Sequence, residues 1–547
     1  MFATVTLRPN RWDWALLPLL LAALLAAAYG AAQMALPIAS AHAATISLDP
    51  AALPGYLLRT LWRMFAALAA SLVFAILFAM AAARYQLARK VLLPVLDVLQ
   101  SVPILGFQAV AVLPFIALFP GRQLGLECAA IFAIFTSQAW NMAFSLYRSM
   151  RTLPAELEEA SAVFRLTGWQ RFWRLELPFA MPNLVWNMMM SMSGGWFFLV
   201  AAEAISVAGQ DFKLPGIGSY IATAIDAGNA SALAWALGAM FAAIVLYDQL
   251  FFAPLLAWTG EAGRRSWLLD CLRRSRVLRQ AAGHLPRLLG AILARLPAPG
   301  AAVRKRRWRL PARAAETLLL AGCAWAAFRL IAFIHGEAGW HEVAGVMELG
   351  LVTALRVMLL TLLASLLWVP VAVWIGLRPA FAQKLQAVAQ LLAAVPVNLL
   401  FPVAVYAMLH YRLDPDIWLS PLMVFGTQWY ILFNVVAGAS TLPGELRLAA
   451  ANLGLRGWLK WKRVYLPAIF PSYVTGAMTA CGGSWNASIV AEYVSWGKTT
   501  LVAHGLGSYI RQMTDAGDGP RLALGISVMC VFVLAINRFV WSRLYRE

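Results

Sequence analysis

The chain has 547 residues, of which 62% are hydrophobic and 13% charged, and its mean hydropathy is +0.71. Several apolar runs are about 20 residues long, which is the length that crosses a hydrocarbon core as a helix, whereas strands of a membrane barrel alternate apolar and polar residues. The composition therefore excludes an ordinary soluble domain and predicts an all-α integral membrane protein.

The positive charge is concentrated in one segment. Residues 259–313 carry 14 Lys and Arg against two acidic residues, out of a net charge of +19 for the whole chain. The segment has few aromatic side chains to stack on bases, so it does not indicate nucleic-acid binding. Positive loops between spans stay in the cytoplasm, and we expect this one to fix the topology and to be attracted to anionic lipid.

The amino terminus resembles a secretory signal, because Arg8 and Arg11 precede an apolar run that ends in small residues at Ala39–Ala43. The apolar run is longer than a usual signal core, so we expect an uncleaved first span. About twelve spans follow from hydropathy, and they place both termini in the cytoplasm. The predicted spans lie near residues 14–34, 57–82, 103–119, 124–147, 182–203, 232–258, 314–334, 349–377, 396–410, 418–438, 470–492 and 520–541.

An internal repeat is the strongest signal in the sequence. Residues 152–228 align without a gap on residues 441–517, and more than a third of the positions are identical. The identities gather at glycine, tryptophan, proline and glutamate, which a shared hydrophobic composition would not select. With six spans in each copy, both halves enter the membrane in the same orientation, so we expect two parallel six-helix repeats with a pathway between them.

A short amphipathic stretch falls in the loop after the fourth span of each copy, "LTGWQRFWRLELP" at 166–178 and "LRGWLKWKRVYLP" at 455–467. Pro154 and Pro443 suit the first turn of a helix before it, and Glu156 and Glu445 lie near the positive end of that helix. We expect Pro178 to end the stretch. A simple interfacial anchor and a docking site for a partner both fit this pattern.

The predicted fifth and eleventh spans each carry a tryptophan and a glutamate seven residues apart, Trp196 with Glu203 and Trp485 with Glu492. Seven residues are two helical turns, so each pair shares one face. A pathway or gating role, a structural hydrogen-bonding role and a solvated helix end are all open for the glutamates.

The two amphipathic loops resemble the "EAA" loop of permease subunits of binding-protein-dependent ABC importers. The first copy reads Glu159-Ala160-Ser161 and Leu177-Pro178 but has Arg165 where the family has glycine. The second copy has Gly454 and Leu466-Pro467 but begins with Leu448 in Leu448-Ala449-Ala450. The resemblance implies ATPase-coupling roles for Glu156, Glu159, Ala160, Gly168, Leu177 and Pro178 and for Glu445, Ala449, Gly454, Gly457, Leu466 and Pro467.

The resemblance is strongest to the nitrate, sulfonate and taurine group of these permeases. It implies two permease domains fused in one chain, 1–258 with a core at about 57–258 and 314–547 with a core at about 349–541, joined by the basic cytoplasmic linker 259–313. It also implies a location in the bacterial inner membrane and two kinds of partner, namely two cytoplasmic ABC ATPase subunits that use ATP and Mg²⁺, and an external, periplasmic solute-binding protein.

The chain itself has no predicted nucleotide, metal or catalytic site. "WGKTT" at 496–500 resembles the end of a phosphate-binding loop, but Glu492 occupies the position of its first glycine. A secondary transporter would place ion-coupling charges deep in several spans, and an embedded enzyme would need paired carboxylates or a histidine cluster there. The substrate stays open, since the subgroup suggests anions whereas two glutamates at a pathway mouth would suit a cation.

Overall fold

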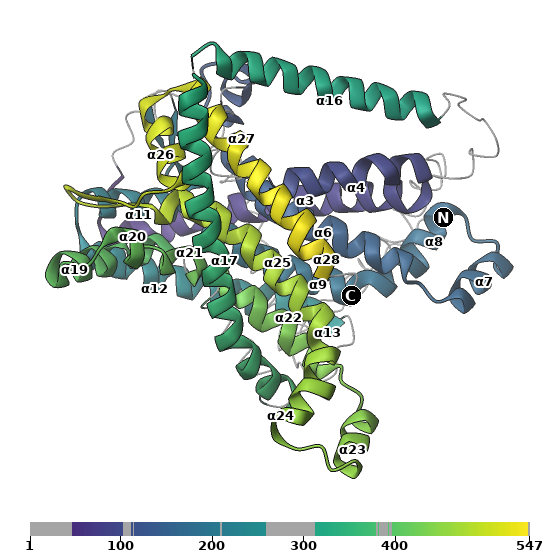
Figure 1. Cartoon of the computed structure of the whole chain (residues 1–547). Helices are drawn as coiled ribbons and strands as arrows, with labels where there is room; N and C mark the ends of the chain where they lie inside the picture. The colour runs from purple at the N-terminus through teal and green to yellow at the C-terminus, as the bar shows by residue number, and fades with distance from the viewer. Residues whose placement is uncertain are drawn as a thin grey trace, which may run out of the picture.

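The computed structural model describes residues 46–101, 111–112, 114–207, 210–258, 312–337, 339–378, 381, 392 and 397–544. The predicted first span at 14–34, most of the predicted span at 103–119 and nearly all of the basic linker lie outside these residues. The described chain is mostly helical and consists of two halves packed against each other (Figure 1).

The first half is built around α3, which runs through 32 residues with a proline in its first turn and Arg84 at its carboxyl end, where a cation is favoured. Helix α3 packs along α6, and α6 packs against α9. The elements of this half are η1 Pro50–Ala52, α3 Leu53–Arg84, α4 Gln86–Ser101, α6 Leu124–Arg151, α7 Ala155–Val163, α8 Gly168–Arg171, η2 Phe172–Glu176, α9 Leu177–Phe197, α10 Leu199–Glu203, β1 Ala204–Val207, β2 Gln210–Lys213, α11 Ile217–Asp226, α12 Ala230–Tyr247, η3 Asp248–Phe252 and α13 Ala253–Trp258.

The second half repeats this plan around α17, which packs against α22, and α22 packs against α25. Its elements are α16 Ala312–His335, α17 Trp340–Gly376, η4 Val397–Leu400, α19 Phe401–Tyr411, α20 Pro415–Trp418, α21 Pro421–Phe425, α22 Gln428–Ser440, α23 Gly444–Asn452, α24 Gly457–Lys460, η5 Trp461–Tyr465, α25 Leu466–Ala491, β3 Tyr493–Trp496, β4 Thr499–Val502, α26 Leu506–Ala516, α27 Gly519–Ile536, η6 Asn537–Trp541 and α28 Ser542–Leu544. The repeat seen in the sequence is therefore a repeat of elements.

Five helices of the described chain are long and apolar enough to cross a membrane, or six if the bent pair α20–α21 and α22 forms one span. They coincide with the predicted spans near 57–82, 124–147, 232–258, 349–377, 520–541 and 418–438. Helices α9 and α25 occupy the predicted fifth and eleventh spans but are less apolar. The described residues contain five or six candidate spans, so the number of twelve stays a prediction.

The amphipathic stretches do not end where the sequence predicts. Pro178 and Pro467 are each the second residue of a long helix, α9 and α25, and the backbone before each of these helices is already helical. The prediction that Pro178 ends the element was therefore wrong, and α9 begins at Leu177 with Pro182 inside it. One π-helical turn, η2 or η5, joins each stretch directly to the span that follows.

The fold is not purely α-helical, because each half contains a two-stranded antiparallel hairpin, β1–β2 and β3–β4. Trp496 pairs with Thr499 across a two-residue turn, and Gly497 at its first position has a positive φ, as a type II′ hairpin turn requires. The "WGKTT" stretch is thus a hairpin turn. It has no helix of its own to hold a phosphate at a helix N-terminus.

The hairpins and the amphipathic stretches lie at opposite ends of the molecule. Figure 1 shows α11, α19, α20 and α26 at the left, α7 and α8 at the right, and α23 and α24 at the bottom. At the hairpin end each half contacts the other, because β3 of the second half packs on α11 of the first and β1 of the first half packs on α26 of the second. The backbone N–H of Gly497 donates to the carbonyl of Ile225 at 2.8 Å, which ties the two halves together there.

Candidate functional site

Two surface elements repeat, one in each half and both away from the hairpins (Figure 1), and we name them the first handle, residues 155–176, and the second handle, residues 444–465. Each begins with a short helix, α7 or α23, whose N-cap is a proline. Two positions after each short helix ends, a residue has positive φ, Arg165 in the first handle and Gly454 in the second. The equivalent backbone bonds Leu166 N to Ser161 O (3.1 Å) and Leu455 N to Ala450 O (3.0 Å) close both turns.

The departure of Arg165 from the family's glycine therefore leaves the backbone of the loop unchanged. A non-glycine residue adopts this left-handed conformation at a cost of about 1–2 kcal/mol, so the first handle holds the turn under strain that the second avoids. The tips also match, since Phe164 and Leu453 precede the turns and are both 76% exposed. Exposed apolar side chains at equivalent tips are what a partner's groove would cover.

Of the residues assigned to coupling by resemblance, Glu156, Glu159 and Glu445 are exposed on α7 and α23, and Pro178 and Pro467 are exposed at the start of α9 and α25. The structure thus places each set on one handle and on the first two residues of the helix that follows it. Contact with an ATPase stays a prediction for these residues.

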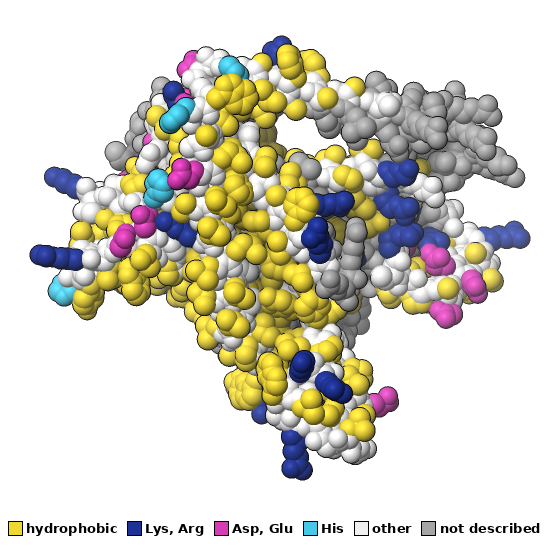
Figure 2. Space-filling model, in the orientation of Figure 1, with side chains coloured by type: hydrophobic (Ala, Val, Ile, Leu, Met, Phe, Trp, Pro, Cys, Tyr) yellow, Lys and Arg dark blue, Asp and Glu magenta, His cyan; other side chains and the backbone are white. Residues whose placement is uncertain are grey.

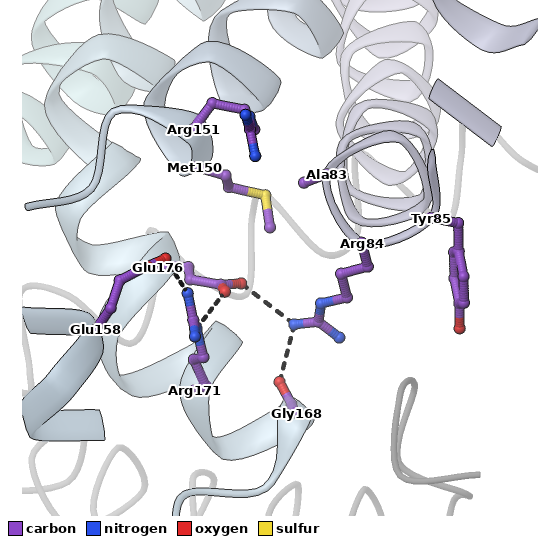
Figure 3. A pocket seen from close by; sticks show the side chains of 9 residues that line it. All are labelled: Ala83, Arg84, Tyr85, Met150, Arg151, Glu158, Gly168, Arg171 and Glu176. Carbon is purple, nitrogen blue, oxygen red and sulfur yellow. Dashed lines mark hydrogen bonds and ion pairs between the residues drawn. The ribbon is translucent and has the colours of Figure 1, made fainter. Parts of the chain in front are cut away.

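An ion-pair network braces the first handle against α3 (Figure 3). Arg84 donates to the carbonyl of Gly168 at 2.9 Å and to Glu176 at 3.2 Å, while Arg171 donates to Glu176 at 2.8 Å and to Glu158 at 2.6 Å. Burial opposes the charge of Arg171, but its hydrogen bonds to Glu158 and Glu176 raise its pKa above the ordinary value. These side chains line a cavity of about 330 Å³.

A buried cluster of charged and polar side chains lies at the hairpin end of the first half. We name Thr60, Arg63, Glu127 and Glu203 the first clasp. Arg63 is 1% exposed and donates to Glu127 (Nη2, 2.7 Å) and to Glu203 (Nη1, 2.7 Å). Glu203 also accepts from Thr60 Oγ1 at 2.8 Å and from the backbone N–H of Gly218 at 2.7 Å.

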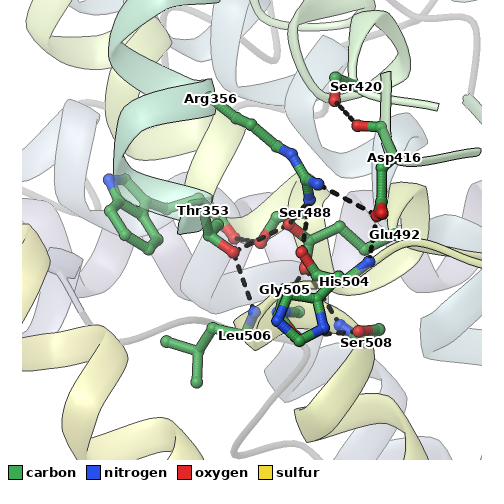
Figure 4. A network of polar contacts seen from close by, with 12 residues as sticks. Thr353, Arg356, Asp416, Ser420, Ser488, Glu492, His504, Gly505, Leu506 and Ser508 are labelled. Atoms are coloured by element: carbon green, nitrogen blue, oxygen red, sulfur yellow. Dashed lines mark hydrogen bonds and ion pairs between the residues drawn. The ribbon is translucent and has the colours of Figure 1, made fainter. Parts of the chain in front are cut away.

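The same cluster occurs in the second half, where Thr353, Arg356, Asp416 and Glu492 form the second clasp (Figure 4). Arg356 donates to Asp416 at 3.1 Å and to Glu492 at 3.4 Å, and Thr353 donates to Glu492 at 2.8 Å. Glu492 accepts the backbone N–H of Gly507 at 2.6 Å. The second clasp is more open, because the Asp416 side chain is 47% exposed whereas that of Glu127 is 6% exposed.

Each clasp glutamate caps a helix that is not its own. The first amides of α11 and α26 have no partner within the helix and donate to the hydroxyls of Thr60 and Thr353. The second amides, at Gly218 and Gly507, donate to the carboxylates of Glu203 and Glu492, where the helix dipole favours negative charge. A Cβ at Gly216 or Gly505 would overlap these carboxylates. The repeated glutamate and Gly-x-Gly pattern is therefore the sequence signature of a carboxylate packed against a helix start.

Both glutamates are fully buried and hydrogen-bonded, so neither is a solvated helix end. Trp196 and Trp485 are also buried, and they stack on Tyr247 and Phe532 with ring centroids 6.3 and 6.1 Å apart. These contacts favour the structural hydrogen-bonding role. A pathway role for the four residues stays a prediction.

The arginines and threonines of the clasps belong to this candidate site, and the sequence reasoning missed them. Both halves contain a Thr-x-x-Arg pattern, at Thr60–Arg63 and at Thr353–Arg356. The offset between these pairs is 293 residues, four more than the offset of the aligned repeat, so an ungapped comparison does not find them. An alignment extended with one gap would have shown the signal.

The two halves face each other between α9 and α22. A cavity of about 10 Å³, which is room for about one water molecule, is lined there by Met190, Ser193, Gly426, Trp429, Tyr430 and Phe433. A Cβ at Gly194 would lie 3.3 Å from the hydroxyl of Tyr430, so glycine lets the halves approach closely. Within the described residues no group of three His, Cys, Asp or Glu side chains is placed to hold a metal.

A helical membrane protein made of two similar halves, with a surface handle at one end of each and contact along a central seam, has the organisation of a paired transport permease. The chain belongs to the family described as binding-protein-dependent transport system inner membrane component, whose model matches residues 71–252 and 368–546, more than half of the chain. Both halves are therefore family domains, as the resemblance of the loops implied.

Among relatives, the chain is similar to the nitrate import permease protein NrtB of Leptolyngbya laminosa, with 25% identity over 179 residues, which are 33% of this chain and 61% of that protein. It is also similar to the molybdenum transport system permease protein ModB of Mycobacterium bovis and of Mycobacterium tuberculosis, with 28% identity over 110 residues, 20% of this chain and 39% of each relative. The chain thus spans less than two thirds of the length of these relatives.

Proposed function

We propose that the chain is a transmembrane permease component of an ATP-driven importer, with its pathway between the two halves and separate ATPase subunits docked on the two handles. The observation that carries this proposal is the pair of handles with the same backbone turn and equally exposed apolar tips. Both handles lie away from the hairpins (Figure 1), which supports two halves of like orientation.

The positions of the charged side chains argue against ion-driven transport. The clasp charges lie at the hairpin ends of their helices, where Glu127 is in the first turn of α6 and Glu203 is the last residue of α10. Each carboxylate is already paired with an arginine or with helix N–H groups. A proton relay needs carboxylates at membrane depth that can lose and regain a proton.

The imported solute is, in this proposal, a small anion. The names of the relatives indicate nitrate and molybdenum as solutes of those proteins. Two glutamates at a pathway mouth would instead suit a cation, but Glu203 and Glu492 are buried and hydrogen-bonded inside the clasps, where each shares an arginine with a second carboxylate. The lining of the seam cavity, with Ser193, Trp429 and Tyr430, carries neutral hydrogen-bond donors and no carboxylate.

A direct test uses the tips of the handles. Phe164→Asp and Leu453→Asp should each reduce co-purification with a co-expressed ABC ATPase and reduce ATP-dependent nitrate uptake in proteoliposomes that contain the solute-binding protein, because a charge would enter an apolar groove. Trp340→Ser is the matched control, since Trp340 is 73% exposed and begins α17 at the hairpin end. Uptake driven by an imposed proton gradient without any ATPase would contradict the proposal.

A further inference from the structure

The two handles share a backbone but differ in charge. Counting Lys and Arg against Asp and Glu, residues 155–176 carry a net charge of −1 and residues 444–465 carry +4. Figure 2 shows acidic side chains over α7 at the right and basic side chains over α23 and α24 at the bottom. Two equivalent surfaces that differ by five charges are not equally suited to bind the same partner.

The handles also differ in how they attach to their own half. The brace of the first handle depends on Arg84, Glu158, Arg171 and Glu176. The equivalent positions of the second half are Leu377, Arg447, Lys460 and Tyr465. Lys460 lies over the ring of Tyr465 at 5.3 Å, and no ion pair joins the second handle to another described element.

The two handles also differ in the position of a repeated tryptophan. Trp169 is partly buried and packs against the core of the first half. Trp458, at the equivalent position, is 72% exposed. Trp458 thus lies on the surface of the second handle, whereas Trp169 packs inward.

The exposed residues of the second handle form one face. Lys462 follows Trp458 by four positions and Arg463 follows Leu459 by four, so the four side chains are neighbours along α24 and η5. All four are exposed, whereas Val464 on the other side is buried. This is an amphipathic, cationic and aromatic segment that continues directly into α25, which occupies the predicted eleventh span.

We propose that this face, Trp458, Leu459, Lys462 and Arg463, binds anionic phospholipid headgroups. The segment leads into α25 and therefore lies at the level of the headgroups. Tryptophan and leucine can enter the boundary between headgroup and acyl chain while the lysine and arginine meet the lipid phosphates. The tip of the second handle, on α23, is separate and stays free for a protein partner.

The test compares the purified full chain in nanodiscs of phosphatidylcholine alone and in nanodiscs that also contain phosphatidylglycerol, with no ATPase present. Hydrogen exchange of residues 456–465 should slow on addition of phosphatidylglycerol, and the Lys462→Gln/Arg463→Gln double variant should lose this slowing. Two basic residues near an anionic surface correspond to a change of roughly 30-fold in the bound population. Arg174→Gln is the matched control, because Arg174 is equivalent to Arg463 and also exposed.

The possible results distinguish a lipid site from a protein-docking surface and from a surface that binds neither. Exchange that is the same in both kinds of nanodisc, or that slows equally in both handles, would overturn the proposal. Slowing of residues 456–465 that requires an added ATPase would show a protein-docking surface in place of a lipid site. None of these results depends on transport, so a failure here leaves the proposed importer function to its own test.

Discussion

The clasps give the sharpest prediction of stability, because the two copies differ in burial. Arg63→Met removes a guanidinium whose side chain is 2% exposed and leaves Glu127 and Glu203 buried without their counter-charge. Loss of one partner from a buried ion pair costs about 3–5 kcal/mol. Arg356→Met should cost less, about 1–2 kcal/mol, because the half-exposed Asp416 can be hydrated and Glu492 keeps Thr353 and two backbone N–H groups.

Thermal unfolding of the purified protein in detergent measures this difference. At about 2–4 °C per kcal/mol for a unit of roughly 200 residues, Arg63→Met should lower the Tm by about 6–20 °C and Arg356→Met by about 2–8 °C. Adding Glu127→Gln to Arg63→Met should recover part of the loss, because one stranded carboxylate becomes neutral. Equal Tm shifts for the two arginines, or a larger shift for Arg356→Met, would refute the argument from burial.

Three further predictions concern the turn and the clasp ends. Arg165→Gly should slow hydrogen exchange of the first-handle turn by about fivefold, since about 1 kcal/mol of left-handed strain is removed; unchanged exchange would contradict the strain. Gly505→Ala should lower the Tm strongly because its Cβ would overlap the clasp carboxylate, whereas Gly482→Ala, in open space within a helix, should raise the Tm slightly. Glutamine at both Glu203 and Glu492 should cut uptake at unchanged expression, and wild-type rates would remove both from any functional site.

The sequence predicted what depends on local pattern. The handles follow from proline, glycine and alternating aromatic and basic residues within about a dozen positions, and the structure contains both. The clasps could not be predicted in the same way. Arg63 meets Glu127 and Glu203 across 64 and 140 residues, and hydropathy gives no signal for such a contact.

The hairpins escaped prediction for a related reason. Residues 204–213 and 493–502 are short, follow directly on an apolar helix and lack a long alternating pattern, so they resemble the end of a span. What makes them strands is tertiary context. The carbonyls of Glu203 and Glu492 accept the N–H groups of Leu214 and Ala503, which closes each hairpin onto its clasp.

The two halves have similar side chains at the clasps but different ones on the handles, and the burial of these side chains explains the difference. In a clasp every polar group needs its partner, because an unpaired charge inside the protein is costly, so both copies keep threonine, arginine, an acidic residue and glutamate. On the handles the side chains meet water, where a charge change costs little, and the position of Glu158 holds Arg447 in the other copy. The fold therefore constrains the charged side chains of the clasps. The charges of the handles can instead differ according to the molecule that each handle contacts.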